Sequence, residues 1–518
     1  MRSAANFKFG GSDFNDFSGI VCSQRALPLP YMLYRMLVKR SIGVAIVLFW
    51  CLMNIFLIKR QLGAPPPVIT VRSTEKITEN IEEWWGVFYR GEKIGYASQT
   101  ITPKLKGYKL HDQSVLNLNL LGTVQPATTR LEMEANEDWI LENFEFELSS
   151  KEIRFTARGR VNDRTLRLEL DSAGHKSTRE ITLSQAPYLL AALKPYVVTQ
   201  QLETGKKFFF STFDPATLSQ QVTTVVIEGR EQIRTGGRTE PAIKLRQSFR
   251  GISVVSWVDG QGRTLKEESP AGLSLVQQSA EDAKAASSRA VSLDIVAQTS
   301  IPVAKAIADP QSRAELKLKL SGINLANFSL SGGRQRLSDA GLEIRREDPQ
   351  QLSARSIPIR DARMTSYLQP TPFLQADHPS IRALATKILN GETNSYRAAV
   401  KIKDWVYKEI AKQPTVSIPN ALEVLQTKRG DCNEHTVLFN ALARAAGIPA
   451  KTVVGIVYLR GAFYYHAWSE IWLSEWISID SVLNQFPSDV THVKFLEGEI
   501  DRQLDILQLI GNLKIEVL

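Results

Sequence analysis

The sequence predicts an α+β protein. Antiparallel β-rich domains come first, a helix packed on an antiparallel sheet follows, and one N-terminal transmembrane helix precedes both. Three observations favour this fold class. One uncharged apolar run near the N-terminus is long enough to cross a bilayer. Period-two hydrophobic patterns fill most of residues 83–278. Helical spacing of apolar residues starts near Leu374 and gives way to strand patterns after about residue 450.

The transmembrane prediction rests on the run from Ser41 to Ile58, which contains no charged residue. The run is longer than the core of a signal peptide, and no small-residue cleavage site follows it. We therefore expect an uncleaved anchor at 41–58, after an N-terminal tail at 1–40. The alternative is a buried core helix. A linker at 59–82 contains Ala64–Pro67, a stiff proline spacer.

Basic residues slightly favour one orientation of this anchor. They are more numerous before residue 41 than just after residue 58, which favours an inside N-terminus. We expect a single-pass protein of the inner, cytoplasmic membrane whose large C-terminal part lies outside, in the periplasm. The chain has only three cysteines, and Cys432 is the one outside the N-terminal region, so an internal disulfide framework is excluded there.

The bulk composition excludes one function class. The chain has 518 residues, of which 43% are hydrophobic and 23% charged, as in ordinary globular proteins. The net charge of +9 comes from basic residues that are scattered among acidic ones. Because no basic stripe is present, we expect no nucleic-acid partner.

The β-rich part divides into two regions. Residues 83–278 read as strands separated by short turns and predict a curved, half-barrel-like antiparallel sheet, interrupted by a helix near 188–196. This domain is interpreted either as a cradle for a substrate or partner, or as a spacer. Residues 279–365 read as a polar linker followed by a small β module.

The candidate nucleophile is Cys432. Asp431 is a good N-cap residue, and the apolar stripe that follows predicts a buried helix starting at the cysteine. Unpaired amide hydrogens and the helix dipole at this end favour a thiolate and can donate to an oxyanion. A structural, buried cysteine is the alternative.

A base and an orienting residue follow on predicted strands. His466 lies in "FYYHAWSEIWL" and Asp480 in "WISID". The two side chains share a sheet face only if the strands are joined by an odd connection or contain a bulge. We therefore predict an odd connection or a bulge between His466 and Asp480, with the Cys432 sulfur beside the imidazole on the same face. A three-residue loop is one such connection: it would pair Trp472 with Trp476 and bring His466 within reach of Asp480.

Three segments, "GDCNEHTVLFNALARAAGIPAKTVVGIVY", "FYYHAWSEIWL" and "WISIDS", resemble the transglutaminase-like superfamily of papain-like cysteine enzymes, here of a membrane-anchored bacterial type. The resemblance covers about 378–494, within a catalytic domain at 366–518. It implies a Cys432–His466–Asp480 triad and a cysteine-bearing helix packed on an antiparallel sheet. The family usually has Asp-Pro-Thr at the third motif, where this chain has Asp480-Ser481-Val482.

The implied activity is a protease, amidase or acyltransferase that acts on peptide or isopeptide amide bonds through a thioester. Its substrate would be a peptide or protein, with cell-wall peptides within reach. The chemistry requires no cofactor and no metal. The alternative is a catalytically inactive binding or scaffold protein of the cell envelope.

Three further residues are assigned to the surroundings of the triad. Gln426 is a candidate oxyanion donor, His435 a hydrogen-bonding neighbour and Trp468 a wall of the site. A competing zinc site would use Cys432 and His435, three residues apart on one helix, with the histidine and aspartate of the triad.

Overall fold

The computed structural model describes residues 77–518 except 152, 173, 201, 271, 286–292 and 349–354. The predicted tail, the anchor at 41–58 and the proline spacer therefore lie outside the described residues. Among the residues that are described, no helix is both long enough and apolar enough to cross a membrane. The described part is α+β and mostly antiparallel, as predicted.

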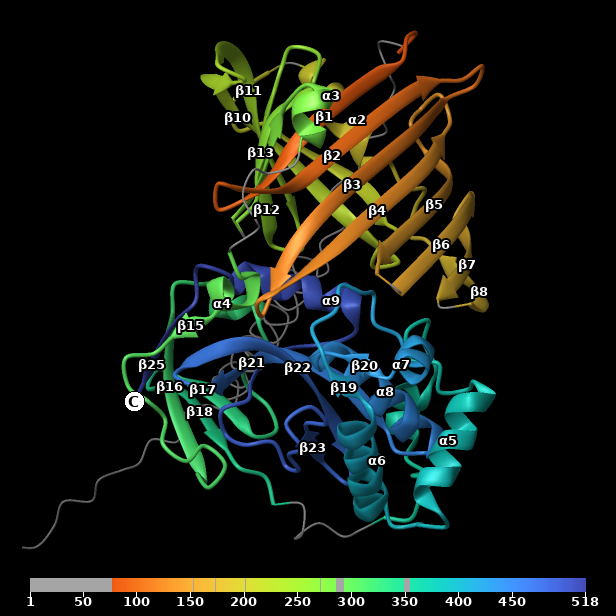
Figure 1. Ribbon diagram of the computed structural model, residues 1–518, viewed down its shortest axis with the longest axis vertical. Helices are drawn as coiled ribbons and strands as arrows, with labels where there is room; N and C mark the ends of the chain where they lie inside the picture. Colours follow the sequence, from red (N-terminus) through yellow and green to blue (C-terminus); the bar gives the residue numbers. More distant parts are fainter. Residues whose placement is uncertain are drawn as a thin grey trace, which may run out of the picture. The chain divides into compact units, whose positions relative to one another are not determined.

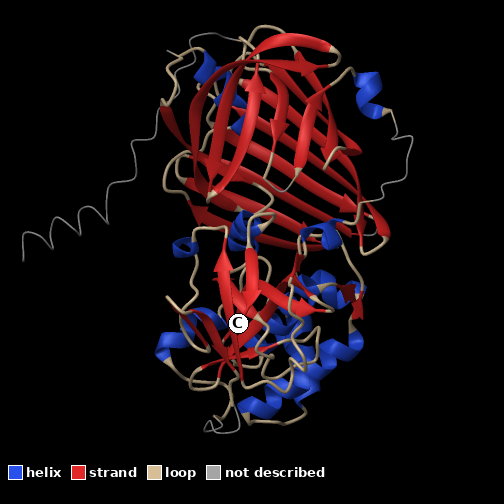
Figure 2. Ribbon diagram, turned by 90° about the vertical axis from the view of Figure 1, so that its left-hand side faces the viewer, coloured by secondary structure: helices blue, strands red, loops and turns tan. Residues whose placement is uncertain are grey.

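Fourteen described strands form one curved antiparallel sheet, which Figure 2 shows wrapping around a common interior. In spatial order its strands are β8 (His175–Thr182), β7 (Thr165–Ser172), β6 (Ile153–Asn162), β5 (Leu141–Ser150), β4 (Thr123–Ala135), β3 (Tyr108–Leu120), β2 (Glu92–Pro103), β1 (Ile81–Tyr89), β14 (Leu273–Gln277), β13 (Thr264–Glu268), β12 (Ile252–Val258), β11 (Arg238–Phe249), β10 (Ser219–Thr235) and β9 (Lys207–Asp214). The chain forms β1 to β8 outward from the middle of the sheet and then β9 to β14 from the other end back to the middle. The first strand, β1, therefore pairs with the last, β14. The half-barrel-like reading of this region is consistent with that curvature.

The two end strands of this sheet, β8 and β9, are not neighbours in its hydrogen-bonded order. The segment between them forms the predicted helix, α2 (Leu190–Val198), and Tyr188 makes isolated bridges to Ile140 and Thr212. Apolar side chains from the inner face of the sheet and from α2 pack together, so they fill part of the space inside the curved sheet.

The C-terminal part contains a second antiparallel sheet with helices on one side (Figure 1). Its strands run in the order β15 (Ile301–Pro302), β22 (Ala462–Trp472), β21 (Ala450–Leu459) and β24 (Val493–Glu497), with β23 (Trp476–Ile479) also paired to β22. The helices are α5 (Pro379–Leu389), α6 (Ser395–Glu409), α7 (Ala421–Thr427) and α8 (Cys432–Ala445). Apolar residues from all four helices and from this sheet share one buried cluster.

The small β module that the sequence predicts is part of a third sheet, which also includes a strand from the C-terminus of the chain. Its strands run β17 (Gln335–Ser338), β18 (Gly341–Arg345), β16 (Glu315–Ser321) and β25 (Lys514–Val517). The last of these is the C-terminal strand of the chain, and one apolar cluster joins this sheet to β21 and β24. The module is therefore completed and packed by residues from the C-terminal part.

The remaining elements are short. Parallel β19 (Ala411–Lys412) and β20 (Arg429–Gly430) hold the segment just before α8. The others are α3 (Ala280–Lys284), α4 (Ile295–Thr299), α9 (Ile500–Gln503) and the 3₁₀ helices η1 (Leu325–Asn327), η3 (Ala362–Leu368) and η4 (Leu504–Leu509).

Candidate active site

The N-terminus of α8 is fixed by a capping box. The Asp431 carboxylate accepts the backbone N–H of Asn433 at 3.0 Å, and the Glu434 carboxylate accepts the N–H of Asp431 at 2.9 Å. Gly430 is required before them, because a Cβ there would lie 2.2 Å from Cβ of Glu434. Cys432 is therefore held at the first helical position, as the sequence predicted.

The thiol lies against the strand that carries the histidine. Thr436, one turn into α8, donates from Oγ1 to the carbonyl oxygen of Ala467 at 3.1 Å. The backbone N–H of Ala467 in turn donates to the Cys432 thiol. Ala467 directly follows His466 on β22, so the thiol contacts the backbone of the strand that carries the histidine, and the residue Cys432 is partly buried.

His466 and Asp480 are hydrogen-bonded. His466 Nε2 lies 2.6 Å from Asp480 Oδ2, and both side chains are buried. Since the carboxylate engages Nε2, Nδ1 is the imidazole nitrogen left to exchange a proton with a thiol.

The strand register that permits this contact is the predicted one. Trp472 pairs with Trp476, so Leu473, Ser474 and Glu475 form a three-residue connection between β22 and β23. The prediction of an odd connection is confirmed, and Asp480 lies just beyond the end of β23 on the same face as His466.

Asp480 is held without the Asp-Pro-Thr turn of the family. Its Oδ1 accepts the backbone N–H groups of Val482 at 2.7 Å and Leu483 at 2.9 Å. Its own backbone exchanges two hydrogen bonds of 2.9 Å with Gln485. These four contacts provide the local rigidity that a proline would otherwise contribute.

His492 is a component of the site whose role the sequence analysis did not foresee. Its Nε2 lies 3.0 Å from the same Asp480 Oδ2 that His466 uses, and its Nδ1 lies 3.3 Å from Asp489 Oδ1. His492 is fully buried and its ring packs edge-on against Trp468. The sequence signal was weak, because the loop after Asp480 has no regular periodicity to show which residues return to it.

Neighbouring ionisable groups shift the pKa values of Asp480 and His492. Burial raises the pKa of Asp480, but the attraction and hydrogen bonds of His466 and His492 outweigh it and hold that pKa well below its usual range. Burial lowers the pKa of His492, but hydrogen bonds to Asp480 and Asp489 outweigh it and raise that pKa above its usual range. Asp480 is therefore an ionised orienting group at neutral pH.

The pKa of Cys432 differs from the sequence-based expectation. Burial, followed by the charge of Asp431, raises the pKa of the thiol well above its usual range, with smaller contributions from Glu434 and Asp480. The Ala467 N–H opposes this rise. Desolvation and the nearby carboxyl groups therefore oppose the thiolate that the helix N-terminus is expected to favour.

The three residues assigned to the surroundings differ in position. Trp468 stacks on His466 with 6.1 Å between ring centroids and 18° between planes, so it forms a wall of the site. His435 is fully buried, and its Nδ1 lies 2.7 Å from the carbonyl oxygen of Asp431. Gln426 is exposed on α7. Its role as an oxyanion donor stays a prediction.

A metal could be held here only by a different set from the predicted zinc ligands. In the described part of the chain, His466, Asp480 and His492 have ligand atoms within 4.8 Å of one another. Cys432 and His435 do not belong to this group. Two imidazoles and a carboxylate are suitable ligands for a transition metal, but the same three groups also satisfy one another as hydrogen-bonded partners.

A cysteine at a helix N-terminus, packed on a strand whose histidine is oriented by a buried aspartate, is typical of enzymes with a cysteine nucleophile. Comparison with known families agrees. Residues 382–481 match the family model of the transglutaminase-like superfamily, so the resemblance predicted from the three motifs is confirmed for this segment.

One curated relative is an "Uncharacterized protein" of Haemophilus influenzae, 33% identical over 111 residues. The match spans 19% of this chain and 30% of the relative. The chain thus covers less than a third of that protein.

Solved structures give weaker likenesses. A "putative cysteine protease" from Cytophaga hutchinsonii is 18% identical with a TM-score of 0.27, over 39% of this chain and 83% of that one. A "putative protease" from Parabacteroides distasonis is 12% identical with a TM-score of 0.19, over 63% and 64%. A β-barrel-like protein of Brucella abortus is 9% identical with a TM-score of 0.32, over 39% and 97%. TM-scores this low do not establish a common fold.

Proposed function

We propose that this protein is a membrane-anchored cysteine hydrolase or transamidase that cleaves peptide or isopeptide amide bonds through a thioester on Cys432. The observation that carries the proposal is the 2.6 Å hydrogen bond from His466 to Asp480 on the sheet whose Ala467 N–H contacts the thiol at the N-terminus of α8. The match of residues 382–481 to the transglutaminase-like superfamily supports it.

Acylation begins from a neutral thiol. As the sulfur of Cys432 attacks the amide carbonyl carbon, its proton passes to Nδ1 of His466, and Asp480 stabilises the imidazolium that forms. The carbonyl oxygen becomes an oxyanion, to which backbone N–H groups at the start of α8 can donate hydrogen bonds. The imidazolium then donates its proton to the leaving nitrogen, the C–N bond breaks and a thioester remains.

Deacylation uses the same residues in reverse. Water or a primary amine attacks the thioester carbon, His466 takes the proton of the attacking group, and the sulfur leaves as the thiol. Water completes hydrolysis, whereas an amine forms a new amide or isopeptide bond. We favour hydrolysis, with periplasmic peptides or proteins as substrates of a single-pass inner-membrane protein.

The test is turnover by purified full-length protein on an acyl-donor panel of peptide amides, with and without a primary amine as acceptor. We expect Cys432→Ala and His466→Ala to abolish turnover, and Asp480→Asn to retain a small fraction because Asp480 does not react itself. Full activity in Cys432→Ala would contradict the proposal. Activity lost on chelation and restored by zinc would instead support a metal-dependent site. A wild-type protein that is inactive towards every donor would favour the scaffold alternative.

A further inference from the structure

The curved sheet encloses a cavity of about 1370 Å³ that lies apart from the Cys432 site. It is larger than most small-molecule sites, which occupy about 300–1,000 Å³. The space arises because several inward positions on neighbouring strands carry small polar side chains, among them Ser98, Ser114 and Thr129. Ser114 and Thr129 hydrogen-bond to each other at 2.6 Å, so they satisfy their hydroxyl groups without filling the interior.

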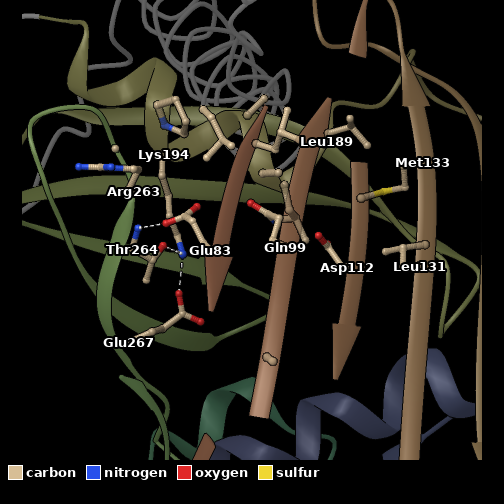
Figure 3. Close-up of a pocket in the computed structure, with 18 of the residues that line it drawn as sticks. Glu83, Gln99, Asp112, Leu131, Met133, Leu189, Lys194, Arg263, Thr264 and Glu267 are labelled. Atoms are coloured by element: carbon tan, nitrogen blue, oxygen red, sulfur yellow. Dashed lines mark hydrogen bonds and ion pairs between the residues drawn. The ribbon is translucent and has the colours of Figure 1, made fainter. Parts of the chain in front are cut away.

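Opposite charges meet on one wall of this cavity (Figure 3). Lys194 extends from α2, and its Nζ donates to Glu267 on β13 at 2.6 Å and to Thr264 Oγ1 at 3.0 Å. Glu83 on β1 accepts the backbone N–H of Thr264 at 3.2 Å. The lysine is thus already paired with Glu267, while Glu83 has a backbone partner but no ion pair with another residue that the structure describes.

The cavity is therefore short of cations. Arg263, the other basic residue of its lining, is paired with Asp259 at 2.7 Å. Among the described residues that line the cavity, Lys194 is then the one ammonium group that interacts with the carboxyl groups of Glu83, Asp112 and Glu267. A second ammonium group would complete the charge balance of the cavity.

Asp112 indicates where that group would bind. Its Oδ1 is buried and has no hydrogen-bond partner among the described residues, although Gln99 donates to the same carboxyl group. A buried acceptor without a donor is costly, and a bound N–H group would remove that cost. Next to it lie the apolar side chains of Leu131 and Met133, with Leu189 above (Figure 3).

We propose that this cavity binds an organic primary amine with an apolar body. The ammonium group donates to Oδ1 of Asp112, on the wall where Gln99 separates Asp112 from Glu83, and the apolar body lies against Leu131, Met133 and Leu189. An alcohol of the same shape would fill the apolar part but would leave the excess negative charge unbalanced. A carboxylate would add to that charge.

The pH dependence of binding follows from the two carboxyl groups. Burial raises the pKa of Asp112 to about 6, opposed by Gln99, His111 and Lys194. Burial likewise raises the pKa of Glu83 to about 7, where Lys194, Thr264 and Arg263 oppose it and Asp259 adds to it. Both groups ionise between pH 5 and 8, so amine affinity should increase across this range while a neutral ligand binds equally throughout.

Calorimetric titration of the full chain with 4-phenylbutylamine, 4-phenylbutanol and 4-phenylbutyrate tests the proposal. At pH 8 we expect the amine to bind at least about tenfold more tightly than the alcohol, and the carboxylate more weakly than both. Asp112→Asn, alone and with Glu83→Gln, should remove the advantage of the amine and leave alcohol binding unchanged. The matched control is Glu145→Gln, an exposed acid on the outer face of β5.

Three results would overturn the proposal. These are equal affinity for amine and alcohol, tighter binding of the carboxylate, which would assign recognition to Lys194, and no binding of any of the three compounds. The single variant guards against misfolding, because Asp112 Oδ1 has no partner to lose. Cys432→Ala should bind the amine normally, so the result is independent of the proposed catalysis.

Discussion

At the scale of single residues, the Cys432 thiol lies near three carboxyl groups, those of Asp431, Glu434 and Asp480, which all raise its pKa. Asp431 caps the helix and also raises the pKa of Cys432 when it is ionised. In the proposed mechanism, the thiol thereby stays protonated until His466 removes its proton during attack. Reactivity would then depend on bound substrate and on the histidine, rather than on a standing thiolate.

Asp431→Asn separates these two roles. Asparagine is an equally good N-cap, so α8 should persist, but the charge beside the thiol is removed. We expect the pKa of Cys432 to fall, and alkylation by iodoacetamide at pH 8 to accelerate up to about tenfold. The rate should be followed on the Cys432 peptide by mass spectrometry, because the chain has two other cysteines. A rate unchanged from wild type would show that Asp431 does not control the thiol.

His492 is predicted to stabilise the fold through Asp480. Its pKa is raised in the folded state, so its contribution is fully present below the unfolded pKa of about 6.5 and is lost as pH rises through the folded pKa. Removing one partner of a buried pair costs about 3–5 kcal/mol. His492→Gln should therefore lower the free energy of unfolding by about that amount at pH 6 and by less at pH 9.

Urea unfolding at the two pH values measures this difference. His175→Gln, at a partly exposed position on β8, is the matched control and should change stability little at either pH. An equal loss for His492→Gln at pH 6 and pH 9 would mean that His492 acts by packing alone.

At the scale of elements, β21 positions the catalytic strand by coming unusually close to its neighbours. Gly455 pairs with His466, and a Cβ at Gly455 would lie 1.9 Å from the carbonyl oxygen of Val493 and 3.0 Å from the Trp468 ring. The register between β21 and β24 also shifts beside Gly455. This glycine therefore allows Trp468 to stack on the histidine.

Gly455→Ala should force β21 and β24 apart and disturb that stacking. We expect a loss of about 1–3 kcal/mol in the free energy of unfolding, as in other overpacked cores, together with reduced turnover. Gly260→Ala provides the control, because a Cβ there meets no atom within 4 Å. If Gly455→Ala and Gly260→Ala had the same stability and activity, the close approach would have no functional meaning.

The elements also show which parts of the candidate site can be predicted from the sequence. Local patterns sufficed for α8, its Asp431 cap and the odd connection between β22 and β23, because each depends on a short stretch of chain. His492 was not reachable, because its approach to Asp480 depends on an irregular loop. The raised pKa of Cys432 was missed because it depends on burial and on carboxyl groups that only the fold brings together.

At the scale of the whole molecule, alternation predicted an antiparallel sheet but not its order. The pairing of β1 with β14 joins residues almost two hundred positions apart, and β25 completes a sheet whose other strands lie far earlier in the chain. Such long-range pairings leave no local signal. The cavity inside the curved sheet was likewise not predicted, since its small inward side chains can be recognised only once the strand faces are known.

The predicted membrane topology depends on residues 41–58, which lie outside the described part of the chain. With an anchor at 41–58 and an inside N-terminus, alkaline phosphatase fused after Leu518 should be active in cells, and a cytoplasmic reporter fused at the same position should be inactive. Deleting 41–58 should reverse both results. The opposite pattern in the full-length fusions would place the Cys432 site in the cytoplasm.

The central claim is that Cys432 carries an acyl group during turnover, and intact-mass spectrometry tests it most directly. The full chain should be mixed with an activated acyl ester, quenched in acid within milliseconds to seconds, and digested to locate the adduct. The account predicts a transient thioester on Cys432 that hydroxylamine removes, and that is absent from Cys432→Ala and greatly slowed in His466→Ala. Acylation of another residue, or the same amount of adduct in His466→Ala as in wild type, would contradict it.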